Sequence, residues 1–130
     1  MSRYVADTHA IFWYLSGSPK LGERARKIFA EAESGKAEIF IPTIVLAELF
    51  FLHEKLGLSA SFREDFLLIS GSAQFSLLPM MPEHVLGFEA LKDVPEMHDR
   101  IIMEVALRLR ASLITRDGLI RRSGLVETVW

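Results

Sequence analysis

Four short, largely apolar runs, of which the first is unbroken, alternate with longer segments of helical periodicity along this chain. The runs lie at residues 4–6, 38–41, 75–78 and 113–115. An unbroken apolar run is typical of a strand buried on both faces, and strands that alternate with helices favour a mostly parallel sheet. The sequence therefore predicts a three-layer α/β/α fold around a central sheet of four to five strands, with residues 125–130 as the fifth, at an edge.

Composition limits the class of protein. Half of the 130 residues are hydrophobic, and the net charge is −2, which excludes a disordered chain and a globally basic nucleic-acid binder. The length predicts one domain over residues 1–130. The absence of cysteine excludes disulfides and thiolate metal sites. No signal peptide is predicted, because the first fifteen residues contain Asp7 and lack a small-residue cleavage segment. No membrane span is predicted, because Pro42, Thr43 and Glu48 interrupt the longest apolar stretch, so we expect a soluble cytoplasmic protein.

Two acids lie at the carboxyl ends of predicted strands. Asp7 ends the first run, just before a helical pattern that begins at Thr8, and Asp117 follows the fourth run. A carboxylate at the carboxyl end of a buried strand is in the usual place for an α/β active site. The alternative is local: Asp7 or Thr8 could only cap the helix, and Asp117-Gly118 could be an ordinary turn.

Two further acids lie near the starts of predicted helices. Glu48 is the one acid in the first two turns of a helix, residues 44–56, that is apolar on every side there. A buried, unpaired carboxylate is costly, so Glu48 should be paired, protonated or metal-bound, unless it lies at an exposed helix edge. Asp99 lies on the apolar face of a helix that ends near Arg110, where a capping role is the alternative. The solvated ridge of that helix is predicted to be Arg100, Glu104 and Arg108.

The four acids should converge. Right-handed crossovers place the carboxyl ends of parallel strands along one edge, where the following helices begin. Asp7, Glu48, Asp99 and Asp117 would then share one cleft, where their mutual repulsion favours a bound cation. Carboxylate oxygens without cysteine or a histidine cluster indicate Mg²⁺ or Mn²⁺.

Four segments carry a resemblance to a known family. Residues 5–10, 47–49, 98–102 and 113–117 look like the acidic signature of PIN domains, and more narrowly of the toxins of VapBC-type toxin–antitoxin pairs. The resemblance covers essentially the whole chain. It implies a PIN-like α/β/α fold, a metal-dependent endoribonuclease, frequent homodimers and inhibition by a cognate antitoxin.

The resemblance also implies roles for residues. The catalytic and metal-binding acids would be Asp7, Glu48, Asp99 and Asp117, supported by the hydroxyls of Thr8 and Thr115. One or two Mg²⁺ ions would orient a water for in-line attack on an RNA phosphodiester. Arg116 and Arg100 would position the RNA backbone, unless they are plain surface charge. His9 is expected to give packing or polar support.

Three other functions fit parts of the pattern. A receiver-type phosphoacceptor domain needs an acidic pair at the first strand end and a late lysine, which are missing here. A haloacid-dehalogenase-like phosphatase needs an acid where His9 stands. A non-catalytic dimeric module that binds a structural ion and a partner protein is the remaining alternative.

Large apolar side chains appear in excess of what the core needs. We expect them to turn outward as a homodimer contact and an antitoxin-binding groove. The side chains concerned are Phe12, Trp13, Tyr14, Phe50, Phe51 and Leu52.

Overall fold

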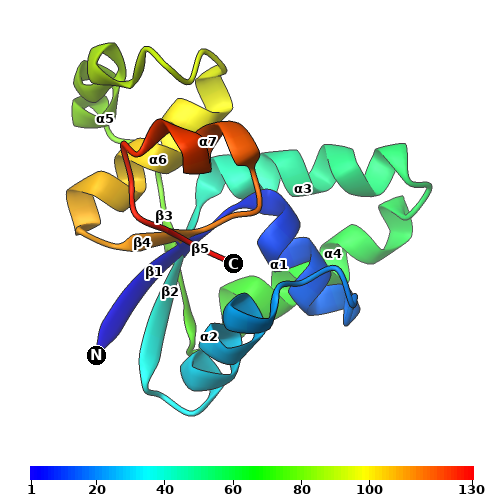
Figure 1. The fold of residues 1–130 in the computed structure, drawn as a ribbon. Helices are drawn as coiled ribbons and strands as arrows, with labels where there is room; N and C mark the ends of the chain where they lie inside the picture. Colours follow the sequence, from blue (N-terminus) through cyan, green and yellow to red (C-terminus); the bar gives the residue numbers. More distant parts are fainter.

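A parallel sheet of five strands, in the order β3-β2-β1-β4-β5, forms the centre of the molecule (Figure 1). The computed structural model describes residues 1–130. The strands are β1 (Ser2–Ala6), β2 (Ala37–Pro42), β3 (Phe75–Leu78), β4 (Ser112–Ile114) and β5 (Thr128–Val129). Each of the four apolar runs is a strand, and the predicted fifth strand lies at the edge as expected. The predicted α/β class with four to five parallel strands is confirmed.

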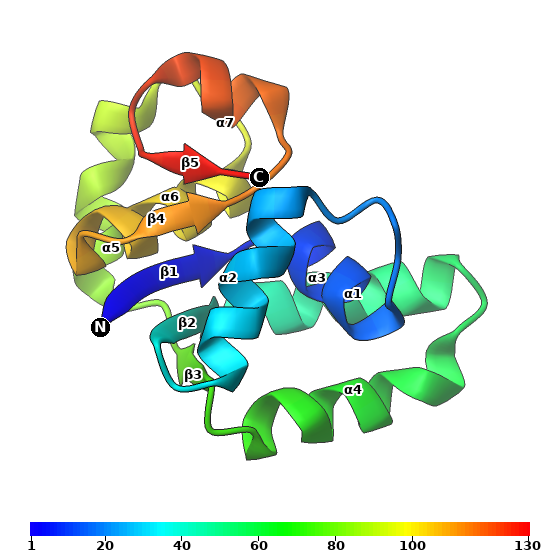
Figure 2. The ribbon, with the colours of Figure 1, turned by 60° about the horizontal axis from the view of Figure 1, so that its bottom comes forward.

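Helices cover both faces of this sheet. They are α1 (Thr8–Ser16), α2 (Glu23–Glu33), α3 (Thr43–Lys55), α4 (Ser59–Gly71), α5 (Pro82–Leu86), the 3₁₀ helix η1 (Gly87–Leu91), α6 (Met97–Leu109) and α7 (Gly118–Ser123). Figure 2 shows α2 in front of the sheet and α6 behind it, which gives the three layers. Because both faces are covered, the central strands are apolar on both sides.

The core is built on the three inner strands. Val5, Ile39 and Leu113 are each fully buried, and they belong to the neighbouring strands β1, β2 and β4. Burial of such side chains is the main favourable term in folding. Strand β1 lies at the centre of the sheet and is held in register by β2 and β4. This pairing fixes the position of the residue that follows β1.

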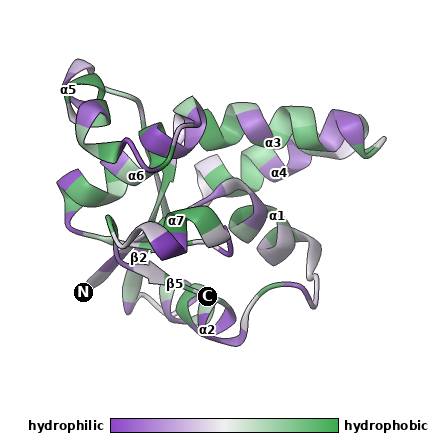
Figure 3. Cartoon of the chain, turned by 45° about the horizontal axis from the view of Figure 1, so that its top comes forward, coloured by the Kyte–Doolittle hydropathy of each residue, from purple (hydrophilic) through white to green (hydrophobic).

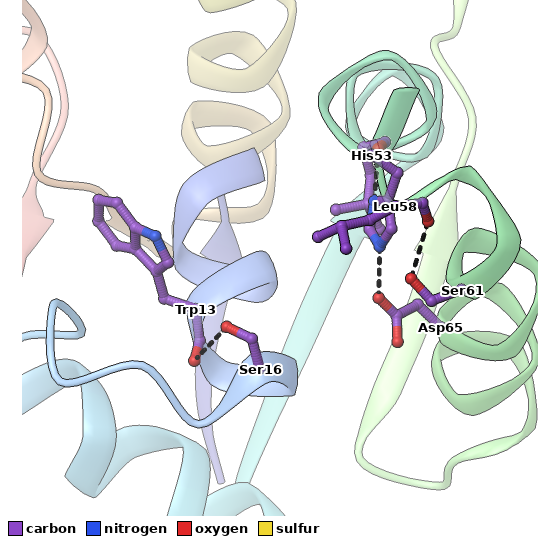
Figure 4. Close-up of polar contacts among 7 residues, drawn as sticks. Trp13, Ser16, His53, Leu58, Ser61 and Asp65 are labelled. Carbon is purple, nitrogen blue, oxygen red and sulfur yellow. Dashed lines mark hydrogen bonds and ion pairs between the residues drawn. The ribbon is translucent and has the colours of Figure 1, made fainter. Parts of the chain in front are cut away.

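The helices α3 and α4 form a pair that extends beyond the sheet (Figures 1 and 2). A buried histidine joins them: His53 Nε2 lies 2.7 Å from Asp65 Oδ2, and His53 Nδ1 lies 2.8 Å from the Leu49 carbonyl (Figure 4). Figure 3 shows that α3 is hydrophobic along most of its length. Phe50 and Phe51 nevertheless remain 40% and 63% exposed.

Two expectations about side chains were wrong. Glu104 is 6% exposed instead of lying on a solvated ridge, because the segment from α5 to η1 packs against this face of α6 and Gly87 leaves room for the carboxylate. Trp13 does not turn outward but is 7% exposed, because it packs against Trp130 near the carboxyl end of the chain. No helix has the length and apolar character needed to cross a membrane.

Candidate active site

The four acids line one pocket at the carboxyl edge of the sheet. Its volume is about 450 Å³. The lining residues are Asp7, Thr8, His9, Trp13, Glu48, Leu52, Asp99, Ile102, Arg116 and Asp117. They come from the segments that follow β1 and β4 and from the helices α1, α3 and α6, so sequence-distant segments meet as the parallel topology requires.

Asp7 is both a helix cap and a pocket residue. Its backbone amide donates to the Ile114 carbonyl at 3.2 Å, which ties the end of β1 to β4. Its Oδ1 accepts from the Ala10 amide at 2.9 Å and so caps α1. The cap leaves the carboxylate oriented beside the pocket, so the capping and active-site interpretations of Asp7 are compatible.

Asp117 repeats this arrangement at the next strand. Its amide donates to Thr115 Oγ1 at 3.0 Å, and its Oδ1 accepts from the Ile120 amide at 2.9 Å to cap α7. A turn at Asp117-Gly118 was the alternative prediction, whereas a short helix begins there. Helix α7 was not predicted, because its six residues are too few for a periodic pattern.

Glu48 reaches the pocket from the second turn of α3. Its Oε1 accepts a hydrogen bond of 2.7 Å from the Thr8 hydroxyl. Its Oε2 lies 3.6 Å from His98 Nδ1, which is also 3.2 Å from Glu96 Oε1. Glu48 is therefore a paired carboxylate, one of the states predicted for it.

Asp99 is free of the capping role that was its alternative. Glu96 caps α6 instead, since its Oε2 accepts from the Asp99 amide at 2.8 Å. The Asp99 carboxylate is left to face the pocket, half-buried, with no hydrogen bond to a protein donor.

Crowding of negative charge marks the site. Burial raises the pKa of Asp7 to about 6, and the neighbouring charges of Asp117 and Glu48 add to the rise, while hydrogen bonds from Thr115 and Ala10 oppose it. Burial likewise raises the pKa of Asp99 to about 6, with contributions from Asp117, Glu96, Glu48 and Asp7. Perturbed carboxyls gathered in a pocket are typical of functional sites.

A divalent cation suits the chemistry of this pocket. The donors are carboxylate oxygens and a threonine hydroxyl, which hard cations such as Mg²⁺ prefer, and the mutual repulsion of the acids is what such a cation would relieve. No three Asp, Glu or His side chains are placed around a common point as metal ligands. Asp7, Asp117 and Glu48 are instead engaged by amides and a hydroxyl of the protein.

One arginine stands beside these acids. The Arg116 guanidinium carbon lies 4.4 Å from the centre of the Trp13 ring, and the His9 ring lies 5.1 Å from the same ring. Burial and the positive charge of Arg116 are the main causes that lower the pKa of His9. Arg100, by contrast, is absent from the lining, and its guanidinium donates to the carbonyls of Val94 and Phe88 at 2.6 and 3.2 Å.

Three pocket residues were missed by sequence reasoning. Trp13, Leu52 and Ile102 line the pocket, yet each also fits the apolar face of its helix. Their apolar type gave no signal that separates a pocket wall from the core. The available signal was spacing from an acid on the same helix: Leu52 lies one turn after Glu48, and Ile102 lies one turn after Asp99.

A family model described as "PIN domain" matches residues 4–124 of this sequence. The matched range contains all four acids. A comparison of the sequence with curated proteins finds no match.

Several solved structures share the fold. VapBC2 from Rickettsia felis, solved with a DNA fragment from its promoter, matches with a TM-score of 0.75 and 16% identity, covering 98% of this chain and 98% of that chain. VapC20 from Mycobacterium tuberculosis, described as a toxin that cleaves the sarcin–ricin loop, matches with a TM-score of 0.72 and 17% identity over 97% and 98%. VapBC-1 from nontypeable Haemophilus influenzae gives 0.68 and 22% over 98% and 96%. At these identities the similarity shows a common fold.

Proposed function

The chain belongs to the PIN-domain family, and from this premise we propose that it is a metal-dependent endoribonuclease that acts as the toxin of a type II toxin–antitoxin pair. The observation that carries the proposal is the set of four acids, from four separate elements, that line one pocket. The fold shared with VapC20, described as a toxin that cleaves the sarcin–ricin loop, supports the reaction class.

Mg²⁺ or Mn²⁺ is the proposed cofactor. Asp7, Glu48, Asp99 and Asp117 would hold it, and when bound it would supply activation of a water and compensation of phosphate charge. The Thr8 hydroxyl orients Glu48 through its hydrogen bond, and the Thr115 hydroxyl supports the loop before Asp117 by accepting from its amide. Asp99, with no protein donor on its carboxylate, is the acid most available to a ligand.

Arg116 is the proposed contact for the RNA backbone. It is the one arginine or lysine that lines the pocket, so it can place a phosphodiester against the acids by charge-assisted hydrogen bonds. Arg100 was the other candidate. Its guanidinium already donates to two backbone carbonyls, which assigns it a part in holding the segment before α6.

The proposed protein partners are a cognate antitoxin and a second copy of the chain. The VapBC neighbours are toxin–antitoxin complexes, and the exposed Phe50 and Phe51 on α3 offer apolar contact area. An antitoxin segment that crosses α3 would pass close to the pocket, because Leu52 of the same helix lines it.

The proposal is tested by cleavage of RNA. Purified wild-type chain should cleave single-stranded RNA with Mg²⁺, and Asp99→Asn should reduce the rate at least about 100-fold while the thermal midpoint stays equal or rises, because one repelling charge is lost. Asp93→Asn is the matched control, since Asp93 is exposed and outside the pocket. Equal cleavage by wild type and Asp99→Asn would instead favour the non-catalytic, metal-binding interaction module of the same fold.

A further inference from the structure

The guanidinium of Arg116 forms no ion pair, although it lies among the carboxylates of the pocket. Four carboxylates line the same pocket, and Asp117 is its neighbour in sequence. The guanidinium nevertheless makes no hydrogen bond and no ion pair within the protein. Arginine beside carboxylates ordinarily forms bidentate pairs, so another contact must hold this guanidinium away from them.

The indole of Trp13 supplies that contact. The guanidinium carbon of Arg116 lies 4.4 Å from the ring centre, well inside the range of a cation–π interaction. The ring itself is fixed by packing: it is 7% exposed and meets the Trp130 ring at 5.7 Å in an edge-on arrangement. Figure 4 shows the indole extending from α1 on the side away from His53.

We propose that Trp13 is a positioning residue that holds Arg116 as a free cation at the rim of the acidic pocket, ready for a phosphate of single-stranded RNA. The cation–π contact uses none of the guanidinium N–H donors, which therefore remain open to the oxygens of a phosphate. RNA then has no internal ion pair to displace when it binds. The inference rests on the proposed nuclease function, because it deepens the role of the same site.

A purely structural role for Trp13 makes a different prediction. As a core residue, Trp13 would affect stability when it is replaced, and RNA binding would change only through loss of fold. As a positioning residue it acts through Arg116, so its effect on RNA binding should vanish once Arg116 is gone.

The test is a double-mutant cycle on RNA affinity. A labelled uridine oligonucleotide is titrated by fluorescence anisotropy at several salt concentrations, in a chelating buffer where the proposed cleavage does not proceed. Arg116→Ala should raise Kd about tenfold, the worth of a charge-assisted hydrogen bond, and should lower the salt slope by about 0.7. Trp13→Leu should raise Kd about three- to tenfold, the range of a cation–π contact, and lower the slope likewise.

The double variant decides between the two roles. Its Kd should equal that of Arg116→Ala, and Trp13→Phe, which keeps an aromatic face, should restore most of the affinity. Three results would each overturn the inference. They are a Kd increase in the double variant equal to the product of the two single increases, an unchanged Kd in a folded Trp13→Leu, and no RNA binding by the wild type.

Two controls keep the test sharp. The first control is Lys20, whose ammonium also lies over the Trp13 ring, at 5.8 Å. Because Lys20 does not line the pocket, Lys20→Ala should change Kd by less than about twofold. If Trp13→Leu does not fold, fluorination of the two tryptophans keeps their shape and weakens the attraction for cations. Kd should then rise in the wild type and stay fixed in Arg116→Ala, and an unchanged wild-type Kd would refute the inference.

The outcomes for the two proposals remain separate. RNA binding with full Trp13–Arg116 coupling but no cleavage under Mg²⁺ would refute the nuclease function and leave the positioning role in place. Cleavage that depends on Asp99, combined with multiplied effects of Trp13→Leu and Arg116→Ala, would refute only the positioning role.

Discussion

Asp7 and Asp117 each perform two tasks with a single side chain. Each caps a helix through one oxygen and lines the acidic pocket. Asparagine is as good an N-cap as aspartate, so an Asn variant at either position keeps the helix start and loses only the charge. These two positions therefore allow charge to be removed from the pocket without loss of local structure.

The raised pKa of Asp7 predicts a pH-dependent stability of the metal-free protein. Because the folded state holds a proton on Asp7 up to about pH 6 and the unfolded chain releases it near 3.8, the contribution of Asp7 to stability is present at low pH and lost as pH rises through 6. Between pH 7.5 and pH 5 the wild type should gain about 1 kcal/mol from this group relative to Asp7→Asn. Urea denaturation of both proteins with a chelator present measures the difference.

The comparison with Asp7→Asn removes the contribution of the histidines, which both proteins share. Asp7→Asn should itself be more stable than the wild type at pH 7.5, where the repelling charge is fully present. Parallel pH profiles of the two proteins would show that Asp7 has an ordinary pKa in the folded state.

Helices α3 and α4 are joined by one buried polar contact. His53 is 1% exposed, and its two ring nitrogens meet the Leu49 carbonyl and the Asp65 carboxylate. Phe12 and Phe62 pack against the imidazole edge-on at 5.4 and 5.8 Å. Since α3 also carries Glu48, the contact supports the helix that delivers an acid to the pocket.

Asp65→Ala should destabilise the fold by about 1–3 kcal/mol, because it leaves a buried ring nitrogen of His53 without a partner. Glu64→Ala is the matched control: the neighbouring residue of α4 is exposed and should change stability by less than about 0.5 kcal/mol. Urea denaturation at pH 7.5 measures both. Equal stabilities of the two variants would show that the contact is not part of what holds α3 to α4.

Across the whole molecule, the acidic pocket makes stability depend on metal ions. A cation that binds only the folded chain stabilises it by mass action, so each tenfold rise in Mg²⁺ above the dissociation constant should add about 1.4 kcal/mol. The thermal midpoint should therefore rise with Mg²⁺ and return when the metal is chelated. Asp99→Asn should lose most of this response, and a wild-type midpoint that is the same in millimolar Mg²⁺ and in chelator would contradict a metal-binding pocket.

The exposed aromatic pair on α3 predicts how partners attach. Phe50 and Phe51 lie 5.2 Å apart edge-on, and the chain should be a homodimer by light scattering that binds its antitoxin across this surface. Phe51→Ser should weaken antitoxin binding about tenfold or more, as loss of an aromatic anchor does, with little change in stability because the side chain is 63% exposed. Leu86→Ser, at an 80% exposed position on α5, should leave antitoxin binding unchanged, and equal effects of the two variants would refute this docking surface.

Local sequence patterns were sufficient to predict the sheet and the edge at which the four acids meet. Unbroken apolar runs such as residues 4–6 identify strands buried on both faces, because only such strands need no polar alternation. Parallel topology then requires Asp7 and Asp117 to end at the same edge, and the pocket contains both. Helical periodicity likewise located α3 and α6, which carry Glu48 and Asp99.

Which side chains meet within that framework depends on long-range packing. Periodicity gives a face of a helix but not what packs on it, so Glu104 was assigned to solvent although the segment from α5 to η1 covers it. For the same reason Trp13 was expected to turn outward, whereas contacts with Trp130 and Arg116, more than 100 residues away in sequence, hold it in the wall of the pocket. Long-range packing leaves no mark in the local pattern of either partner, because each residue type is compatible with many neighbours.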